Sequence, residues 1–282
     1  MKLEKIISNA KINLSLSVLK KLKSKFHKIE SLICFIDLHD EIYLNKLKNK
    51  RHKIIFYGKF AKGINKKNTI STLMQILDKK KLLNEDKYLI KIKKNIPHKS
   101  GLGGGSINAA KILKYFIKKY KLKLYHKEIL KITSKIGSDT IIGVHKTPII
   151  QLSDGEVKKT KFKKKLHLVL VKPNFGCSTK EIYSKVRNFS KTSHKLIKSR
   201  NLSHTFLSKL SNDLEIPAFK KNSKLNKIKS FMKDLNNILF ARMTGSGSTM
   251  IAYFNSKKDA ENAHKILKKK YKNYWCILSK TI

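Results

Sequence analysis

The chain has 282 residues, and 40% of them are hydrophobic, enough to form the core of one large domain or of two of ordinary size. Lysine and arginine total 65 against 18 acidic residues, and a net charge of +47 usually suggests a nucleic acid or a membrane surface as a partner. Only 4 of these cations are arginine, and the lysines are spread along the chain, so we expect no specific nucleic-acid partner. Lysine, isoleucine and asparagine have A/T-rich codons, and codon bias explains the excess of lysine.

Three cysteines, Cys34, Cys177 and Cys276, lie far apart without CxxC spacing, and the 10 histidines show no metal-ligand spacing. This pattern argues against a disulfide framework and a zinc site, and it is typical of a reducing compartment. No apolar run reaches the length of a membrane span, and Lys5 and Lys11 bracket the only apolar stretch of the N-terminus, which lacks the core of a signal peptide. We expect a cytoplasmic protein that does not bind a membrane.

The N-terminal part of the chain is rich in predicted strands. Apolar residues alternate with polar ones over 12–18, which predicts a strand with one buried face. Asn68 stands where an N-cap belongs and predicts the start of a helix. Further strands are predicted over 31–38, 41–45, 53–57 and 89–94.

A glycine-rich stretch follows the last of these strands. Four of the chain's 12 glycines fall within residues 101–105, where the backbone is free to approach a ligand. Directly after it, apolar residues at helical spacing predict an amphipathic helix over 107–120. A strand, a glycine loop and a helix N-terminus in succession bind phosphate through backbone N–H groups and the helix dipole. The sequence therefore predicts a nucleotide-phosphate loop.

The loop is not of the two most common kinds. No Gly-x4-Gly-Lys followed by Ser or Thr occurs, which excludes a Walker A loop, and Ser106 stands where the third glycine of a Rossmann fingerprint belongs. The His-Arg-Asp and Asp-Phe-Gly signatures of protein kinases are missing as well. A flexible linker is the simplest alternative, but it fits poorly with the amphipathic helix that follows at once.

The rest of the chain mixes helices and strands without regular alternation, which indicates an α+β fold. The turn signal 153–155 lies between a strand and a lysine-rich segment, and we place the boundary of two domains there, giving 1–155 and 156–282. We predict a helix over 126–136, strands over 148–152 and 166–171, then mainly helices, a strand pair 238–243 and 249–254 around the glycine turn 244–248, a helix over 257–270 and a last strand over 274–279.

Several separated motifs resemble those of one family. They are the loop within 97–110, Asn-Ala-Lys-Ile-Asn-Leu at 9–14, Phe-His-Lys-Ile-Glu-Ser-Leu at 26–32, Gly-Ser-Asp at 137–139 and Met-Thr-Gly-Ser-Gly-Ser at 243–248. Their order and spacing are similar to those of the GHMP kinases, which include galactokinase, homoserine kinase and mevalonate kinase. The resemblance covers most of the chain. It implies a two-domain architecture with the active site in the cleft between the domains, and ATP and Mg²⁺ as co-substrate and cofactor.

The resemblance also implies the catalytic pair. Asp139 would accept the proton of the acceptor hydroxyl, and Lys11 would pair with that aspartate and stabilise the attacking oxygen. Judged without the resemblance, Asp139 is more often a helix cap or a solvated acid, and Lys11 is one of 61 lysines, since 65 cations less 4 arginines leaves 61. No acidic residue presents itself as a metal ligand, so we predict no protein metal site.

The nucleotide would be held by the loop and by one upstream residue. The N–H groups of 103–106 and the Ser106 hydroxyl would contact phosphate, and Asn68 would contact adenine, although its N-cap role alone explains its place. The predicted nucleotide-binding residues are Asn68, Pro97, His98, Lys99, Ser100, Gly101, Leu102, Gly103, Gly104, Gly105, Ser106 and Ile107.

The acceptor implied by the resemblance is a small molecule, a cytidine diphosphate ester of methylerythritol. Aromatic faces would stack on the cytosine ring while His27 meets its polar edge. The second glycine turn would form the lip of the site, although an ordinary hairpin explains it equally well. The predicted substrate-binding residues are Asn13, Phe26, His27, Tyr183, Gly245, Ser246 and Gly247.

The chain departs from the family pattern at three places. Phe26 replaces the usual Tyr, Ile107 stands at a normally small position, and Thr140-Ile141 replaces Val-Pro after Asp139. Two alternatives stay open: a homoserine or mevalonate kinase, and a polyanion-binding protein on a kinase-like scaffold. Retention of Lys11, Ser106 and Asp139 favours a kinase, and we expect a monomer or a weak homodimer.

Overall fold

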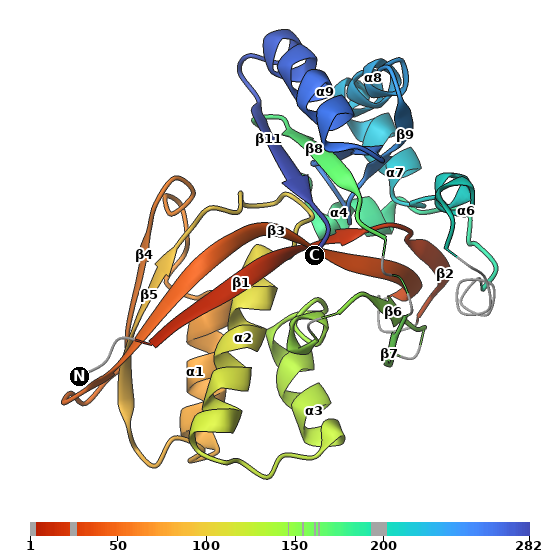
Figure 1. Cartoon of the computed structure of the whole chain (residues 1–282). Coiled ribbons are helices and arrows are strands. Elements are labelled where there is room, and N and C mark those ends of the chain that lie inside the picture. The colour runs from red at the N-terminus through yellow and green to blue at the C-terminus, as the bar shows by residue number, and fades with distance from the viewer. Residues whose placement is uncertain are drawn as a thin grey trace. The chain divides into compact units, whose positions relative to one another are not determined.

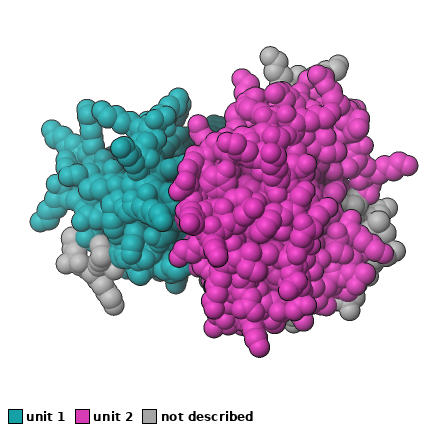
Figure 2. Space-filling model, turned by 90° about the horizontal axis from the view of Figure 1, so that it is seen from above, with its two compact units in different colours: residues 1–10, 38–98, 103–146 teal, residues 11–37, 99–102, 147–282 magenta. Residues whose placement is uncertain are grey.

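The structure is a computed structural model that describes residues 4–22, 27–145, 147–153, 155–160, 162, 164–192 and 202–282. It divides into two compact units, coloured separately in Figure 2. Unit 1 comprises residues 1–10, 38–98 and 103–146, and unit 2 comprises residues 11–37, 99–102 and 147–282. The units are defined by packing and combine segments that are distant in sequence. The division into 1–155 and 156–282 stays a prediction about the sequence domains.

Unit 1 is a layer of strands with helices against one face (Figure 1). It contains residues 4–10 of β1 (Glu4–Asn13) and 38–47 of β3 (His27–Leu47), β4 (Lys53–Tyr57), α1 (Thr69–Lys79), β5 (Lys87–Lys93), α2 (Gly104–Lys119), α3 (His126–Ile136) and the 3₁₀ turn η1 (Ile142–Val144).

The core of unit 1 follows from alternation along β3 and β5. These strands pair antiparallel with Ile42 opposite Ile92 and Leu44 opposite Ile90, while β4 pairs parallel with β5. Because side chains alternate between the two faces of a sheet, these residues share the face that carries the core. All four are buried in one cluster with apolar residues of α1 and α2, such as Leu73. The amphipathic helices predicted from the sequence therefore pack on this sheet.

Unit 2 contains a separate antiparallel sheet with the strand order β11-β8-β10-β9. Its elements are residues 11–13 of β1 and 27–37 of β3, β2 (Ser17–Lys21), β6 (Ile149–Gln151), β7 (Val157–Lys159), β8 (His167–Lys172), α4 (Thr179–Ser184), α6 (His204–Lys209), α7 (Glu215–Lys221), α8 (Ser223–Lys233), β9 (Ile238–Met243), β10 (Met250–Phe254), α9 (Lys257–Lys270) and β11 (Trp275–Lys280).

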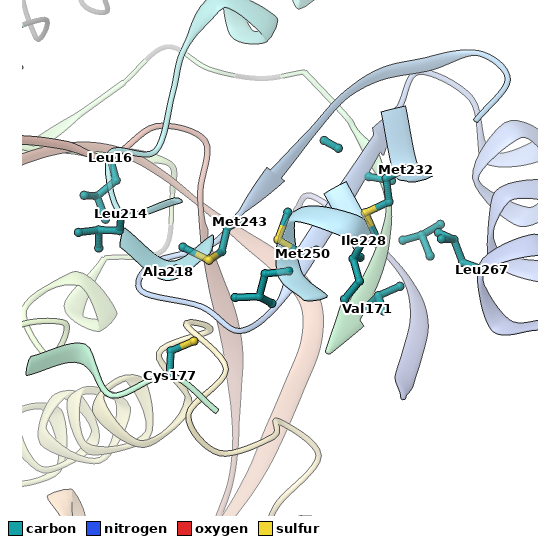
Figure 3. Close-up of a cluster of buried hydrophobic side chains, with 14 of the residues drawn as sticks. Leu16, Val171, Cys177, Leu214, Ala218, Ile228, Met232, Met243, Met250 and Leu267 are labelled. Carbon is teal, nitrogen blue, oxygen red and sulfur yellow. The ribbon is translucent and has the colours of Figure 1, made fainter. Parts of the chain in front are cut away.

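The core of unit 2 lies between this sheet and helices α8 and α9. Val171 of β8 and Met250 of β10 pack in one cluster with Ile228 and Met232 of α8 and Leu267 of α9, and all five are buried (Figure 3). Burial of this apolar surface is the main force that holds the helices on the sheet. The cluster also includes Met243, the last residue of β9 before the second glycine turn.

The α+β character and most predicted elements are confirmed. Two predictions are wrong in detail. The single strand expected over 12–18 is interrupted, because the N–H groups of Leu14 and Ser15 both donate to the carbonyl oxygen of Leu32, at 2.8 and 3.3 Å. The strands expected over 31–38 and 41–45 form one long strand, β3, which contributes residues to both units.

Candidate active site

The predicted site residues are divided between the two units. The chain passes from unit 2 to unit 1 inside the glycine loop, between Leu102 and Gly103. Phe26 lies outside the described residues. Unit 1 carries Asn68, Pro97, His98, Gly103, Gly104, Gly105, Ser106, Ile107 and Asp139, and unit 2 carries Lys11, Asn13, His27, Lys99, Ser100, Gly101, Leu102, Tyr183, Gly245, Ser246 and Gly247.

In unit 1 the glycine loop leads directly into the N-terminus of α2. Gly103 is the N-cap residue, and its φ of 71° lies in the left-handed region that favours glycine. No side chain caps this helix end, and the N–H of Ile107 donates to the carbonyl oxygen of Gly103 at 2.9 Å. The N–H groups of Gly104, Gly105 and Ser106 precede this bond and have no acceptor within the helix. These donors and the helix dipole suit a phosphate anion.

The loop serine lies beside the turn that carries Asp139. Gly137 follows the end of α3, and a Cβ built on it would lie 3.2 Å from Oγ of Ser106 and 3.7 Å from Oγ1 of Thr140. Thr140 is fully buried, and its hydroxyl has no hydrogen-bond partner among the described residues. Asp139 itself is partly exposed. Unit 1 therefore places the predicted phosphate-binding serine and the predicted base on neighbouring turns.

Asn68 has a structural task that occupies its side chain. Its Oδ1 accepts hydrogen bonds from the N–H groups of Ile70 and Ser71, each at 3.0 Å, so the predicted N-cap of α1 is confirmed. Its Nδ2 donates to the carbonyl oxygens of Asn65 and Lys66 at 3.0 and 3.1 Å. A contact with adenine stays a prediction.

Ile107, which departs from the family pattern, is fully buried. A Cβ on Gly143 of η1 would lie 3.1 Å from Cα of Ile107 and 2.6 Å from Cβ of Ala110. The start of α2 therefore packs closely on η1, and the side chain of Ile107 belongs to this packing. Its predicted contact with nucleotide is untested.

A buried ion pair that the sequence patterns did not indicate lies next to the start of α2. Lys94 follows β5 and pairs with Asp40 of β3, and the two residues are 3% and 0% exposed. Lys94 lies at the end of the predicted strand of alternating lysine and isoleucine, where nothing in the sequence distinguishes it from the exposed lysines.

In unit 2, Lys11 is buried on β1 and points to Asn13. Its Nζ donates to Oδ1 of Asn13 at 2.8 Å, and its backbone N–H donates to the carbonyl oxygen of Leu102 in the glycine loop at 3.1 Å. Nδ2 of Asn13 donates to Oγ of Ser31 at 2.7 Å. Both ends of the Asn13 amide are therefore held by protein groups, and its predicted substrate contact is untested.

The two glycine turns of unit 2 pack backbone against backbone. A Cβ on Gly101 would overlap the carbonyl oxygen of Thr244, and a Cβ on Gly245 would lie 3.2 Å from the carbonyl oxygen of Gly101 and 3.4 Å from Nζ of Lys11. Thr244 Oγ1 accepts a hydrogen bond from the N–H of Asn13 at 3.1 Å. Unit 2 thus brings Lys11, Gly101 and Gly245 together.

Asn212 holds the second glycine turn, and the sequence contains no signal that identifies it. This residue is 2% exposed, and its Nδ2 donates to the carbonyl oxygens of Met243 and Gly245, each at 2.8 Å. Ser246, in the same turn, exchanges a hydrogen bond of 2.9 Å with Oγ1 of Thr179. The turn between β9 and β10 is therefore a fixed hairpin.

His27 and Tyr183 lie side by side in unit 2. Their ring centroids are 5.2 Å apart, with the planes tilted by 38°. Nε2 of His27 is buried and has no hydrogen-bond partner in the described part of the chain. Burial lowers the pKa of His27, and the charge of Lys21 lowers it further. A neutral imidazole with an unused polar atom beside an aromatic ring can receive a planar, hydrogen-bonding ligand.

Within the residues that the structure describes, no group of three or more His, Cys, Asp or Glu side chains could hold a metal ion. None of the helices in these residues is long and apolar enough to cross a membrane. The three cysteines are free.

Comparison with known proteins identifies two domains of one family. Residues 68–148 match the GHMP kinases N terminal domain, and residues 195–273 match the GHMP kinases C terminal domain. Over 278 residues the chain is 52% identical to the 4-diphosphocytidyl-2-C-methyl-D-erythritol kinase of Pelagibacter ubique strain HTCC1062, covering 99% of each chain. It is 34% identical to the kinase of the same name from Clostridium tetani, covering 99% of this chain and 100% of the relative.

Solved structures share the fold at lower identity. A crystal structure of 4-(cytidine 5'-diphospho)-2C-methyl-D-erythritol kinase aligns with a TM-score of 0.78 and 21% identity, covering 99% of this chain and 100% of the other. Homoserine kinase from Cytophaga hutchinsonii aligns with a TM-score of 0.69 and 17% identity, covering 100% and 95%. Mevalonate kinase from L. major, in complex with R-mevalonate, aligns with a TM-score of 0.71 and 16% identity, covering 99% and 95%.

Proposed function

This chain belongs to the GHMP kinase family, and we propose that it transfers the γ-phosphate of ATP to the 2-hydroxyl of 4-diphosphocytidyl-2-C-methyl-D-erythritol. The products are the 2-phosphate and ADP, in the non-mevalonate route to isopentenyl diphosphate. The observation that carries the proposal is the 52% identity, over 99% of both chains, to a relative named for this substrate. The solved structures of homoserine kinase and mevalonate kinase align at only 17% and 16% identity.

The start of α2 is proposed to hold the nucleotide. Phosphoryl transfer requires mainly that the phosphates be held, the acceptor oriented and the developing charge neutralised. The N–H groups of Gly104, Gly105 and Ser106 and the Ser106 hydroxyl would contact phosphate oxygens. Support comes from the uncapped helix end and the left-handed N-cap at Gly103.

Asp139 and Lys11 are proposed to act on the acceptor hydroxyl. Asp139 would orient the hydroxyl and accept its proton, and the packing of its turn, at Gly137, against the Ser106 hydroxyl supports this role. The Lys11 ammonium would stabilise the attacking oxygen as negative charge develops. Its burial and its hydrogen bond to Asn13 support a fixed position for that charge.

His27 and Tyr183 are proposed to bind the cytosine ring. The Tyr183 ring offers an aromatic face, and Nε2 of His27 would contact the polar edge of the base. A buried polar atom without a partner is costly, and a ligand that satisfies it is favoured over one that does not. This argument supports a cytidine substrate over homoserine or mevalonate, neither of which contains a base.

Mg²⁺ is proposed to arrive with ATP. Mg²⁺ usually keeps several water ligands and binds through one or two carboxylates together with substrate phosphates, so a protein site with several acids is not required. We assign no protein ligand to the ion, which would neutralise phosphate charge when bound. We also propose that the protein works in the cytoplasm, and the free cysteines support a reducing compartment. We propose a monomer or a weak homodimer without a specific nucleic-acid partner.

A panel of acceptors tests the proposal. The purified chain is assayed for ADP release with MgATP and, separately, 4-diphosphocytidyl-2-C-methyl-D-erythritol, homoserine and mevalonate. We expect rapid turnover with the first acceptor only, with the phosphorylated product identified by mass spectrometry. Preference for homoserine or mevalonate would assign another acceptor. Absence of ADP release with all three, in protein that is folded by circular dichroism, would contradict the kinase proposal.

A further inference from the structure

The buried carboxylate of Asp40 joins three segments of unit 1 beneath the start of α2. Its Oδ1 accepts hydrogen bonds from the N–H groups of Asn95 and Ile96, at 2.8 and 2.9 Å. Its Oδ2 accepts from Nδ2 of Asn108 at 2.8 Å and pairs with the ammonium of Lys94. Asp40 is completely buried, and four donors surround its charge.

The ammonium of Lys94 lies close to the first residue of α2. A Cβ built on Gly104 would lie 3.3 Å from Nζ of Lys94 and 3.0 Å from Cγ2 of Ile96. The absence of a side chain at Gly104 therefore makes room for this ammonium. Asn108, which contacts Asp40, lies four residues further along α2, on the same face as Gly104.

These contacts orient the ion pair along the helix. Its positive end, Lys94, lies at the first residue of α2, and its negative end, Asp40, contacts the helix one turn later. The N-terminus of a helix already carries positive partial charge, so a buried cation at this end is unfavourable. Burial also lowers the pKa of Lys94, while Asp40 opposes this shift. An anion bound at the same turn would relieve the repulsion.

We propose that Lys94, held by Asp40, is a positioning residue whose buried positive charge strengthens the binding of ATP phosphates at the N-terminus of α2. The inference rests on the proposed function and deepens it. Lys94 acts from beneath the loop, through the field and geometry of the helix start. Its contribution therefore depends on the number of phosphates of the nucleotide and not on the adenosine.

A double variant that removes both charges tests this inference in the full-length chain. Lys94→Met with Asp40→Asn leaves no unpaired buried charge, and the new amide retains an acceptor for Asn95 and Ile96. Dissociation constants for ATP, ADP and adenosine are measured by calorimetry. We expect ATP to bind about tenfold more weakly, ADP to lose less, and adenosine to change by less than about twofold, because Coulomb interaction scales with ligand charge.

The matched control removes a similar ion pair from the opposite, solvent-exposed side of the same strands. Lys93 directly precedes Lys94 in sequence, and its half-exposed ammonium lies 3.5 Å from Glu41, a 14% exposed carboxylate that also pairs with Lys5. Lys93→Met with Glu41→Gln should leave all three affinities within about twofold of the wild type, since solvent screens exposed pairs.

The ratio of ATP to adenosine affinity decides the outcome. An unchanged ratio in the folded double variant of Lys94 and Asp40 would mean that the pair only supports the fold, and it would overturn the inference. Lys94→Arg retains the charge and serves if the double variant does not fold. This variant should preserve the ratio of ATP to adenosine affinity. A lower ratio in folded Lys94→Arg would also contradict the inference. Failure of the wild type to bind ATP would instead contradict the proposed function.

Discussion

The chain uses clustered glycines twice, in the loop before α2 and in the turn between β9 and β10, and the two regions differ in what the glycines make possible. In the loop, Gly103 adopts a left-handed conformation and α2 begins without a side-chain cap, so backbone donors stay available to a ligand. In the turn, Asn212 binds the carbonyl groups of Met243 and Gly245, and the absence of a side chain at Gly245 lets the backbone of Gly101 approach. One region presents hydrogen-bond donors, whereas the other is fixed by internal contacts.

Internal contacts account for the second turn without a ligand, and the substrate contacts expected of Gly245, Ser246 and Gly247 stay a prediction. The element that comes after the glycines decides their use. A helix supplies several parallel N–H groups and a dipole, while a hairpin pairs most of its backbone groups internally. The comparison predicts that damage to the loop appears in nucleotide affinity, damage to the turn appears in stability, and loss of the catalytic groups appears in turnover.

The largest expected effect comes from the proposed catalytic groups, which lie outside both glycine regions. Asp139→Asn removes the proton acceptor, and kcat should fall by roughly 10²–10⁴-fold, with KM for ATP little changed. Lys11→Ala should show a similar loss, and the double variant should be little worse than either single one if the two groups act as a unit, as proposed. Steady-state ADP release gives kcat and KM for the two single variants and the double variant. Asp234→Asn, at an exposed aspartate, is the control. Near-wild-type turnover in Asp139→Asn would remove this residue from the mechanism.

The next largest effect tests the loop. Gly103→Val places a branched side chain at a φ of 71°, which should move the first residues of α2 and weaken ATP binding by about 100-fold or more. Gly63→Val is the matched control, because Gly63 has a φ of 83° and no atom lies within 4 Å of the position that a Cβ would take there. Calorimetry with ATP and circular dichroism on both variants separate affinity from folding. Equal ATP affinity in Gly103→Val and wild type would contradict the assigned loop.

A smaller effect is expected from the turn. Asn212→Ala leaves two buried carbonyl groups without their donor, which should lower the free energy of unfolding by about 1–3 kcal/mol. ATP affinity should change by less than about threefold, since the loop before α2 is not altered. Asn222→Ala, which removes the partly exposed N-cap of α8, is the control for loss of an asparagine amide. Urea unfolding measures the change in the free energy of unfolding, and titration with ATP measures the change in affinity. A large loss of ATP affinity with unchanged stability in Asn212→Ala would show that the turn between β9 and β10 acts on the nucleotide and not on stability.

The smallest effect concerns pH and the acceptor. Burial, and less strongly Lys21, keeps the pKa of His27 below the ordinary value of 6.5, so the ring is neutral at pH 7. KM for the cytidine acceptor should be constant above pH 6.5 and rise several-fold as pH falls through the pKa of the folded state. Over the same interval the unfolded chain binds more protons than the folded chain, so this histidine lowers stability as pH falls. His27→Gln should flatten the KM profile, and an unchanged profile would exclude the contact.

Local sequence patterns predicted many of the elements and the position of the phosphate loop. The N-cap at Asn68 predicted the start of α1 correctly, and the strands predicted over 53–57 and 89–94 correspond to β4 and β5, because these signals depend on neighbours a few residues apart. The glycine run followed by an amphipathic helix marked the start of α2 within three residues. Family resemblance, and not spacing, led to Lys11 and Asp139, since neither residue has a distinctive local pattern.

The α+β class, the glycine loop and the family could all be read from the amino-acid sequence, because each depends on motifs that are continuous along the chain. Only the tertiary structure shows that Lys94 is buried beside Gly104 and that Asn212 donates hydrogen bonds to the second glycine turn. Asp40 and Lys94 are 54 residues apart, and Asn212 reaches Gly245 across 33. A buried lysine and an exposed one have the same local sequence signature in a chain with 65 cationic residues, and the difference comes from the partner that folding brings to each.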